Sequence, residues 1–218
     1  MSPAMSQSYE KSPVREYFES IVIAVILALF VRTFVVQAFK IPSGSMEDNL
    51  LVGDHLLVNK FIFGGAPTGA ERIVLPIRDI HRGDVIVFKF PEDPDRDFIK
   101  RTIGLPGETV EIRDKAVYIN GRPLDQADYH LKFKPRSEDG RLEPRAFNWG
   151  PATVPAGHLF MMGDNRDDSA DSRFWGFLPI SYVKGRAMTI YFSYDPAATG
   201  PASLVTSIRW GRLFRQVH

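Results

Sequence analysis

The chain reads Phe39-Lys-Ile-Pro-Ser-Gly-Ser-Met46 where its only long hydrophobic run ends. Pro42 fixes its own φ and pushes the preceding residue towards an extended conformation, whereas Gly44 permits a turn that other residues resist. A serine on such a constrained turn, between apolar neighbours, is a candidate nucleophile. Ser-Gly-Ser is also typical of a flexible linker, so these residues alone leave both interpretations open.

The segment before this turn, residues 17–38, is predicted to be a single uncleaved transmembrane anchor helix. Ile21–Val31 is wholly apolar, and about twenty residues at ~1.5 Å each reach across a hydrocarbon core about 30 Å thick. A cleaved signal peptide is disfavoured because no Ala-x-Ala-like site follows the run. Residues 1–16 are polar and serine-rich, which predicts a disordered tail.

Residues 39–202 have the pattern of a mainly β domain. Period-two alternation and turn residues indicate short strands and no further long helix. Residues 122–157 are polar and proline-rich, and we expect a small insertion there. The predicted strands cover residues 50–54, 56–60, 84–90, 98–103, 110–112, 116–119, 158–162, 182–189 and 191–193.

The C-terminal segment, residues 203–218, allows two interpretations. Arginines alternate with apolar residues at helical spacing, so this basic amphipathic segment is suited to lie on an anionic membrane surface. The alternative is a tail that packs on the domain.

Composition excludes several classes of function. The 218 residues are 44% hydrophobic and 24% charged, as in a folded protein. The net charge of +1 gives no basic excess for nucleic acid. The absence of cysteine removes disulfides, thiolate catalysis and cysteine metal ligands.

Lys100 is a candidate general base. Strand alternation places Phe98, Lys100 and Thr102 on one face. Such a lysine is either solvated at a sheet edge or buried and neutral near pH 7. The second state requires the lysine pKa to fall by about three units, or ~4 kcal/mol, which desolvation alone can supply.

A third segment, Met161–Phe177, is dense in acidic residues. Calcium binding is disfavoured, because Arg166 takes the third position of the EF-hand pattern and the required glycine does not follow. The favoured interpretation is a polar loop braced by Asp–Arg pairs, in which Ser169 and Asp171 orient an amine and Arg173 holds Asp171.

Taken together, these segments resemble the bacterial type I signal peptidases, membrane-bound serine proteases that remove signal peptides from exported proteins. The resemblance covers about half of residues 39–190 and rests on five blocks in order: Ile41-Pro-Ser-Gly-Ser-Met46, Gly53-Asp-His-Leu-Leu-Val-Asn-Lys60, Arg82-Gly-Asp-Val-Ile-Val-Phe88, Phe98-Ile-Lys-Arg-Thr-Ile-Gly-Leu-Pro-Gly-Glu108 and Gly163-Asp-Asn-Arg-Asp-Asp-Ser-Ala-Asp-Ser-Arg-Phe-Trp-Gly-Phe177.

The resemblance implies an antiparallel β-sheet catalytic domain in which Ser45 is the nucleophile and Lys100 the general base. The reaction would pass through an ester on Ser45, without a metal or cofactor. The Ser43 hydroxyl and the Ser45 N–H would stabilise the oxyanion.

Further roles follow from the same resemblance. Ser169 would hydrogen-bond the lysine amine, and Asp171 and Arg173 would brace that loop. Two shallow pockets for small residues of an Ala-x-Ala-type substrate would be lined by Phe39, Ile41, Met46, Leu50, Leu56, Val87, Phe98 and Ile99.

The expected partners are signal peptides of secretory preproteins and membrane lipid, with no nucleic acid. The expected location is the bacterial inner membrane, single-pass, with the catalytic domain on the outer face.

The chain also departs from the family pattern. The family usually shows x-Pro-Thr-Leu after Met46, and here the residues are Glu47-Asp-Asn-Leu50. Two other classes stay open: a serine hydrolase that uses His55, His81 or His158, and an anchored β-domain that binds exported chains without cleaving them.

Overall fold

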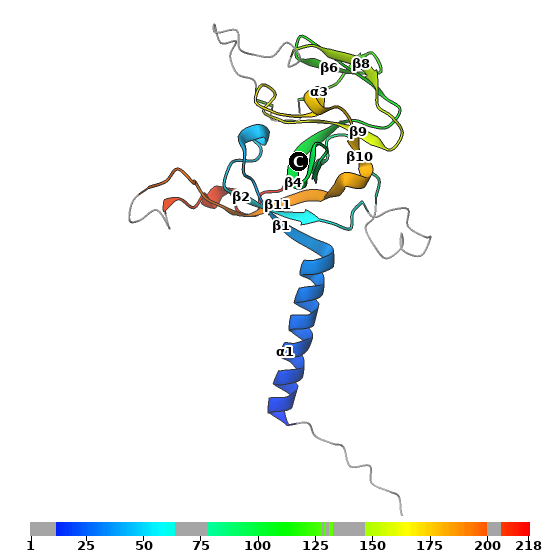
Figure 1. Cartoon of the computed structure of the whole chain (residues 1–218). Coiled ribbons are helices and arrows are strands. Elements are labelled where there is room, and N and C mark those ends of the chain that lie inside the picture. The colour runs from blue at the N-terminus through cyan, green and yellow to red at the C-terminus, as the bar shows by residue number, and fades with distance from the viewer. Residues whose placement is uncertain (1–11, 64–77, 128, 130, 133–146, 200–205) are drawn as a thin grey trace, which may run out of the picture.

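The computed structural model describes residues 12–63, 78–127, 129, 131–132, 147–199 and 206–218. A helix projects from a β domain built of two sheets, and the smaller sheet lies at the end of the domain away from that helix (Figure 1). All strand pairings within the two sheets are antiparallel. The expectation of a mainly β, antiparallel fold is therefore confirmed.

The larger sheet has seven strands. In spatial order they are β1 (Val36–Lys40), β2 (Asp54–Asn59), β11 (Val183–Ser193), β3 (Val85–Phe90), β4 (Asp93–Gly104), β9 (His158–Met162) and β10 (Leu178–Pro179). The smaller sheet has four strands, in the order β7 (Arg122–Pro123), β6 (Ala116–Ile119), β5 (Thr109–Arg113) and β8 (Trp149–Thr153).

Strand β3 shows why hydrophobic clusters pack against both faces of the larger sheet. All its residues except Lys89 are β-branched or aromatic. Alternation sends Val85 and Val87 into one hydrophobic cluster and Ile86 and Phe88 into another. All four side chains are 2% exposed or less. Strand β4 pairs with this buried strand, Lys100 opposite Ile86, so the lysine is carried on a rigid element in the centre of the sheet.

The N-terminal helix α1 spans Pro13–Phe30 and buries none of its residues. It continues as a π-helical turn, Val31–Val35, before β1 begins. The helix predicted over residues 17–38 is therefore wrong at both ends. The helix starts four residues earlier because Pro13 suits its first turn, and residues 36–38 pair with β2 instead.

Within the described ranges, every helix falls short of the length and apolar character needed to cross a membrane.

Several short elements differ from expectation. Residues 50–53 lie outside any strand, with a turn at 52–53, and Asp54 alone of the first predicted strand is extended, as the first residue of β2. The expected insertion at 122–157 contains β7 and β8, and β8 completes the smaller sheet by pairing with β5. Residues 133–146 of that stretch lie outside the described residues. The strands predicted at 182–189 and 191–193 form the single strand β11.

The C-terminal tail packs on the domain over residues 206–218. It forms one 3₁₀ turn, Trp210–Arg212, and then runs beside β11, where the Phe214 N–H donates to Ile190 O at 2.7 Å. Val217 is buried, whereas Trp210 and Phe214 are exposed. Of the two interpretations of this segment, the structure therefore shows the tail that packs on the domain.

Candidate active site

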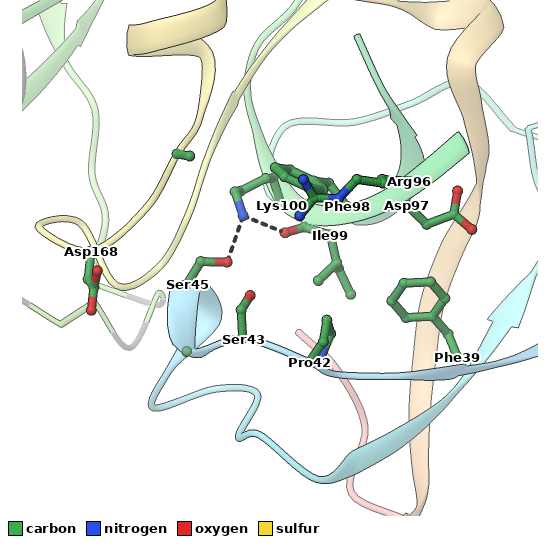
Figure 2. A pocket seen from close by; sticks show the side chains of 12 residues that line it. Phe39, Pro42, Ser43, Ser45, Arg96, Asp97, Phe98, Ile99, Lys100 and Asp168 are labelled. Carbon is green, nitrogen blue, oxygen red and sulfur yellow. Dashed lines mark hydrogen bonds between the residues drawn. The ribbon is translucent and has the colours of Figure 1, made fainter. Parts of the chain in front are cut away.

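A cavity of about 620 Å³ opens between four parts of the chain (Figure 2). One wall is the Ser45 turn, residues 42–50, of which Pro42 to Ser45 line the cavity. A second wall is residues 96–100 of β4. Phe39 of β1 and two residues of the acidic loop, residues 163–171, complete the lining: Asp168 and Ala170.

The Ser45 and Lys100 side chains meet inside this cavity. Lys100 Nζ donates to Ser45 Oγ at 2.6 Å and to Ile99 O at 3.1 Å. Nζ also lies 5.3 Å from the centre of the Phe98 ring. Lys100 is 3% exposed and Ser45 is 9% exposed, so the pair is largely shielded from water. The prediction that Lys100 is buried beside apolar groups is met by this geometry.

Burial lowers the pKa of Lys100 to about 8, because the charged amine loses its hydration. The carboxylates of Asp171 and Asp164 act in the opposite direction, and the Arg173 charge adds to the lowering. A far larger fraction of this amine is therefore neutral at pH 7 to 8 than of an exposed lysine. A neutral amine beside a serine hydroxyl can accept its proton.

The Ser45 turn is held by its apolar neighbours. Residues Gly44–Met46 form a 3₁₀ turn, and Ile41 and Met46 on either side of it are fully buried. Each such side chain stabilises the folded turn by about 1.5–3 kcal/mol. The serine is thus fixed by packing, which excludes the flexible-linker interpretation.

Gly163 allows the acidic loop to approach the turn closely. A Cβ at this position would lie 2.3 Å from Ser169 Oγ and 2.5 Å from the carbonyl oxygen of Ser45. The next residues bind the turn directly, since the Asn165 N–H donates to Ser45 O at 3.1 Å and its Nδ2 donates to Gly44 O at 3.0 Å.

Asp171 and Arg173 form a buried ion pair. Arg173 donates from Nε to Asp171 Oδ1 and from a terminal nitrogen to Oδ2, each at 2.8 Å. Asp171 also accepts from the Gly163 N–H at 3.1 Å and caps the short helix α3 (Ser172–Trp175). The structure therefore brings together Asp171 and Arg173 as the sequence predicted.

The two remaining serines are placed differently. Ser43 is exposed and lines the cavity beside Ser45, with its hydroxyl on the same side (Figure 2). Ser169 is 8% exposed, and its hydroxyl has no hydrogen-bond partner among the described residues. The predicted bond from Ser169 to the lysine amine is not formed in this structure.

The eight predicted pocket residues fall into two groups. Phe39, Phe98 and Ile99 line the cavity. The others pack in the hydrophobic core beneath it and are 2% exposed or less: Ile41, Met46, Leu50, Leu56 and Val87.

Sequence reasoning missed the residues that join the Ser45 turn to β4. Asp164 is fully buried and accepts from Arg101 Nε at 2.7 Å and from an Arg101 terminal nitrogen at 2.6 Å. It also accepts from Asn49 Nδ2 at 2.7 Å. The position of Arg101 directly after the candidate base was the available signal, but Asp164, the carboxylate that it binds, lies 63 positions away in the chain.

The histidines weighed as alternative bases lie elsewhere. His55 Nδ1 contacts Gly53 O, His158 Nδ1 contacts Ala156 O, and His81 Nδ1 contacts Arg78. None of these three residues lines the cavity. No group of three or more His, Asp or Glu side chains in the described ranges is arranged to hold a metal ion.

Comparison with known proteins gives consistent matches. Residues 14–192 match the family described as Signal peptidase, peptidase S26. Signal peptidase I of Pseudomonas aeruginosa is 39% identical over 229 residues, covering 89% of this chain and 78% of that protein. Signal peptidase I of Leptolyngbya laminosa is 39% identical, covering 87% of this chain and 85% of that protein. The crystal structure of a signal peptidase I from Enterococcus faecalis is 36% identical, with a TM-score of 0.40, and covers 50% of this chain and 97% of that one.

Proposed function

The chain belongs to the signal peptidase I family of serine endopeptidases, peptidase S26. We propose that it removes signal peptides from exported preproteins, with Ser45 as nucleophile and Lys100 as general base. The observation that carries the proposal is the 2.6 Å contact between Lys100 Nζ and Ser45 Oγ at the wall of a cavity.

In the first half of the reaction, the neutral amine of Lys100 takes the Ser45 proton as Oγ attacks the scissile carbonyl carbon. The Ser43 hydroxyl and the Ser45 N–H donate to the oxyanion of the tetrahedral intermediate. The protonated amine then gives its proton to the leaving amino group, which departs as the new N-terminus. The signal peptide is left as an ester on Ser45.

In the second half, a water molecule gives a proton to the neutral Lys100 amine and attacks the ester carbonyl. Collapse of the second tetrahedral intermediate releases the carboxyl end of the signal peptide, and Ser45 recovers its proton from Lys100. Asp171 and Arg173 fix the acidic loop beside the base during both halves. No step requires a metal or cofactor.

Selection of small residues is supported by the cavity wall. Phe39, Phe98 and Ile99 line the space next to the Ser45 turn, and the core residues beneath them leave that wall rigid. The cleavage test uses a preprotein with Ala-x-Ala before the scissile bond and a matched preprotein with phenylalanine at the last position. We expect a new N-terminus after the second alanine in the first substrate only. Binding of the first substrate without cleavage would instead favour a non-catalytic β-domain.

Ser43→Ala is expected to lower kcat by about 10² to 10³, because one of two oxyanion donors is lost while the nucleophile and base remain. KM should change little, since the donor acts mainly in the transition state. Steady-state kinetics on the Ala-x-Ala preprotein measure both values. Full activity in Ser43→Ala would show that its hydroxyl does not stabilise the oxyanion.

We propose that the Ser169 hydroxyl, which makes no bond to the lysine amine in the resting structure, forms one during the reaction. Ser169→Ala is then expected to lower kcat by about tenfold, the effect of one hydrogen bond of roughly 1–1.5 kcal/mol. Thermal stability should not fall, because the buried Ser169 hydroxyl has no hydrogen-bond partner among the residues that the structure describes. Kinetics and a melting curve on the same preparation separate the two effects. Unchanged kcat would remove Ser169 from its proposed orienting role.

We also propose that α1 attaches the catalytic domain to the outer face of the bacterial inner membrane. The support is the row of exposed apolar side chains along α1, including Ile21 at 62% and Ile26 at 61% exposed. Deletion of residues 1–35 keeps β1 and its pairing with β2. We expect the full chain to float with liposomes and the shortened chain to stay largely in the aqueous fraction. Equal flotation of both chains would assign attachment to the β domain, and flotation of neither would contradict membrane attachment.

A further inference from the structure

The segment directly behind the nucleophile contains Asn49, whose side chain connects this segment to the acidic loop. Asn49 lies four positions after Ser45 and does not line the cavity. Its side-chain amide reaches out of the Ser45 turn and donates to Asp164 Oδ2 at 2.7 Å.

Asp164 is in turn fixed to the strand that carries the base. Arg101, the residue after Lys100, donates hydrogen bonds to both carboxylate oxygens of Asp164, at 2.7 and 2.6 Å, and is 1% exposed. Arg101 also donates to Gly83 O at 2.8 Å. Two parallel hydrogen bonds fix the orientation of the Asp164 carboxylate relative to Arg101. The carboxylate oxygen that accepts from Asn49 is therefore held in place.

The backbone of Asn49 is held from the other side by the C-terminal tail. A terminal nitrogen of Arg212 donates to Asn49 O at 2.8 Å and to Asp54 Oδ2 at 2.6 Å. The Arg212 side chain is 12% exposed. Asn49 is therefore fixed at its carbonyl by the tail and at its amide by Asp164.

We propose that Asn49 is a positioning residue that holds the Ser45 hydroxyl at its distance from the Lys100 amine. The contacts run from the Ser45 turn through Asn49 and Asp164 to Arg101, next to Lys100. This inference deepens the proposed function and rests on the roles given there to Ser45 and Lys100. Because Asn49 lies outside the cavity lining, its loss should change the rate of the chemical step and not the binding of substrate.

The test compares the full-length wild-type chain with Asn49→Ala, Asn49→Thr and Asn148→Ala. Threonine keeps a short polar side chain at this place, and its hydroxyl restores one donor towards Asp164. Asn148 is an exposed matched control, whose Oδ1 accepts from the Asp114 N–H at 3.0 Å in the region of the smaller sheet. Two reactions are followed for each variant: cleavage of the Ala-x-Ala preprotein, and acylation by the small activated ester p-nitrophenyl acetate, which needs no signal peptide.

For Asn49→Ala we expect kcat to fall by about 10- to 100-fold in both reactions, because displacement of a nucleophile by about 1 Å has an effect of this order. KM for the preprotein should stay within about twofold, Asn49→Thr should recover at least part of kcat, and Asn148→Ala should match wild type. Circular dichroism melting shows whether Asn49→Ala remains folded at the assay temperature.

The inference is overturned if a folded Asn49→Ala keeps wild-type kcat, if only KM changes, or if Asn49→Thr is as impaired as Asn49→Ala. Acylation of the wild type without preprotein cleavage would contradict the proposed function alone, and the Asn49 comparison would still be decided by the acylation rates. Absence of both reactions in the wild type would overturn the inference together with the roles of Ser45 and Lys100.

Discussion

Ser45→Ala is expected to reduce preprotein cleavage by on the order of 10⁴-fold or more, which is the effect of removing the nucleophile from a serine hydrolase. Without Oγ no ester forms, and no other hydroxyl takes its place: Ser43 lies beside it, but the Lys100 amine contacts Ser45. The variant should remain folded, because Ile41 and Met46 still fix the turn and alanine fits wherever serine does.

The measurement is the initial rate of preprotein cleavage together with a melting curve. Ser181→Ala, an exposed serine in the 3₁₀ turn Ile180–Tyr182, is the matched control and should retain full activity. Cleavage above about 1% of wild type by a folded Ser45→Ala protein would show that another group attacks the substrate.

Lys100→Arg is expected to lower kcat by about 10² to 10⁴, the contribution of a general base, even though arginine keeps the positive charge. The guanidinium stays protonated under all assay conditions and cannot accept the Ser45 proton. It is also larger than the amine that it replaces, at a site that is only 3% exposed. Lys100→Met removes the amine with little change in length and should be equally impaired.

Two comparisons make this result specific. Lys89→Arg, at an exposed position of β3, should match wild type. Single replacements of His55, His81 and His158 by alanine should leave most of the activity, because none of these residues lines the cavity. An active Lys100→Arg enzyme, or one histidine whose loss is fatal, would contradict a mechanism based on serine and lysine.

The sequence predicted those parts of the fold that depend on local pattern. β3 and β9 combine strong β-formers with clear turn residues, and their positions were found to within one residue. β1 was missed because its apolar residues continue the hydrophobic run of α1, and only pairing with β2 makes them extended. β8 was missed because its sequence, Trp149-Gly-Pro-Ala-Thr153, has poor strand propensity and becomes a strand by pairing with β5.

In the candidate site, too, residues in short local motifs were predicted, and contacts between distant segments were not. Short motifs pointed to Ser45 and Lys100, whose side chains are 55 positions apart in the sequence and meet only in the folded chain. Local pattern does not contain the link from Asn49 through Asp164 to Arg101, because the three residues come from separate segments. The division of the pocket residues into cavity wall and core also depends on packing, since Ile41 and Phe39 are both apolar and two positions apart.

The most direct test of the central claim is the dependence of kcat/KM on pH for the wild-type chain. Only the neutral amine of Lys100 accepts the Ser45 proton, and burial lowers its pKa to about 8. The rate should therefore be low well below pH 8, rise through an apparent pKa near 8 and level off above it, an apparent value that belongs to the coupled Ser45–Lys100 pair. A rising limb near 10.5, the value of an ordinary lysine, or near 6.5, the value of a histidine, would contradict the account.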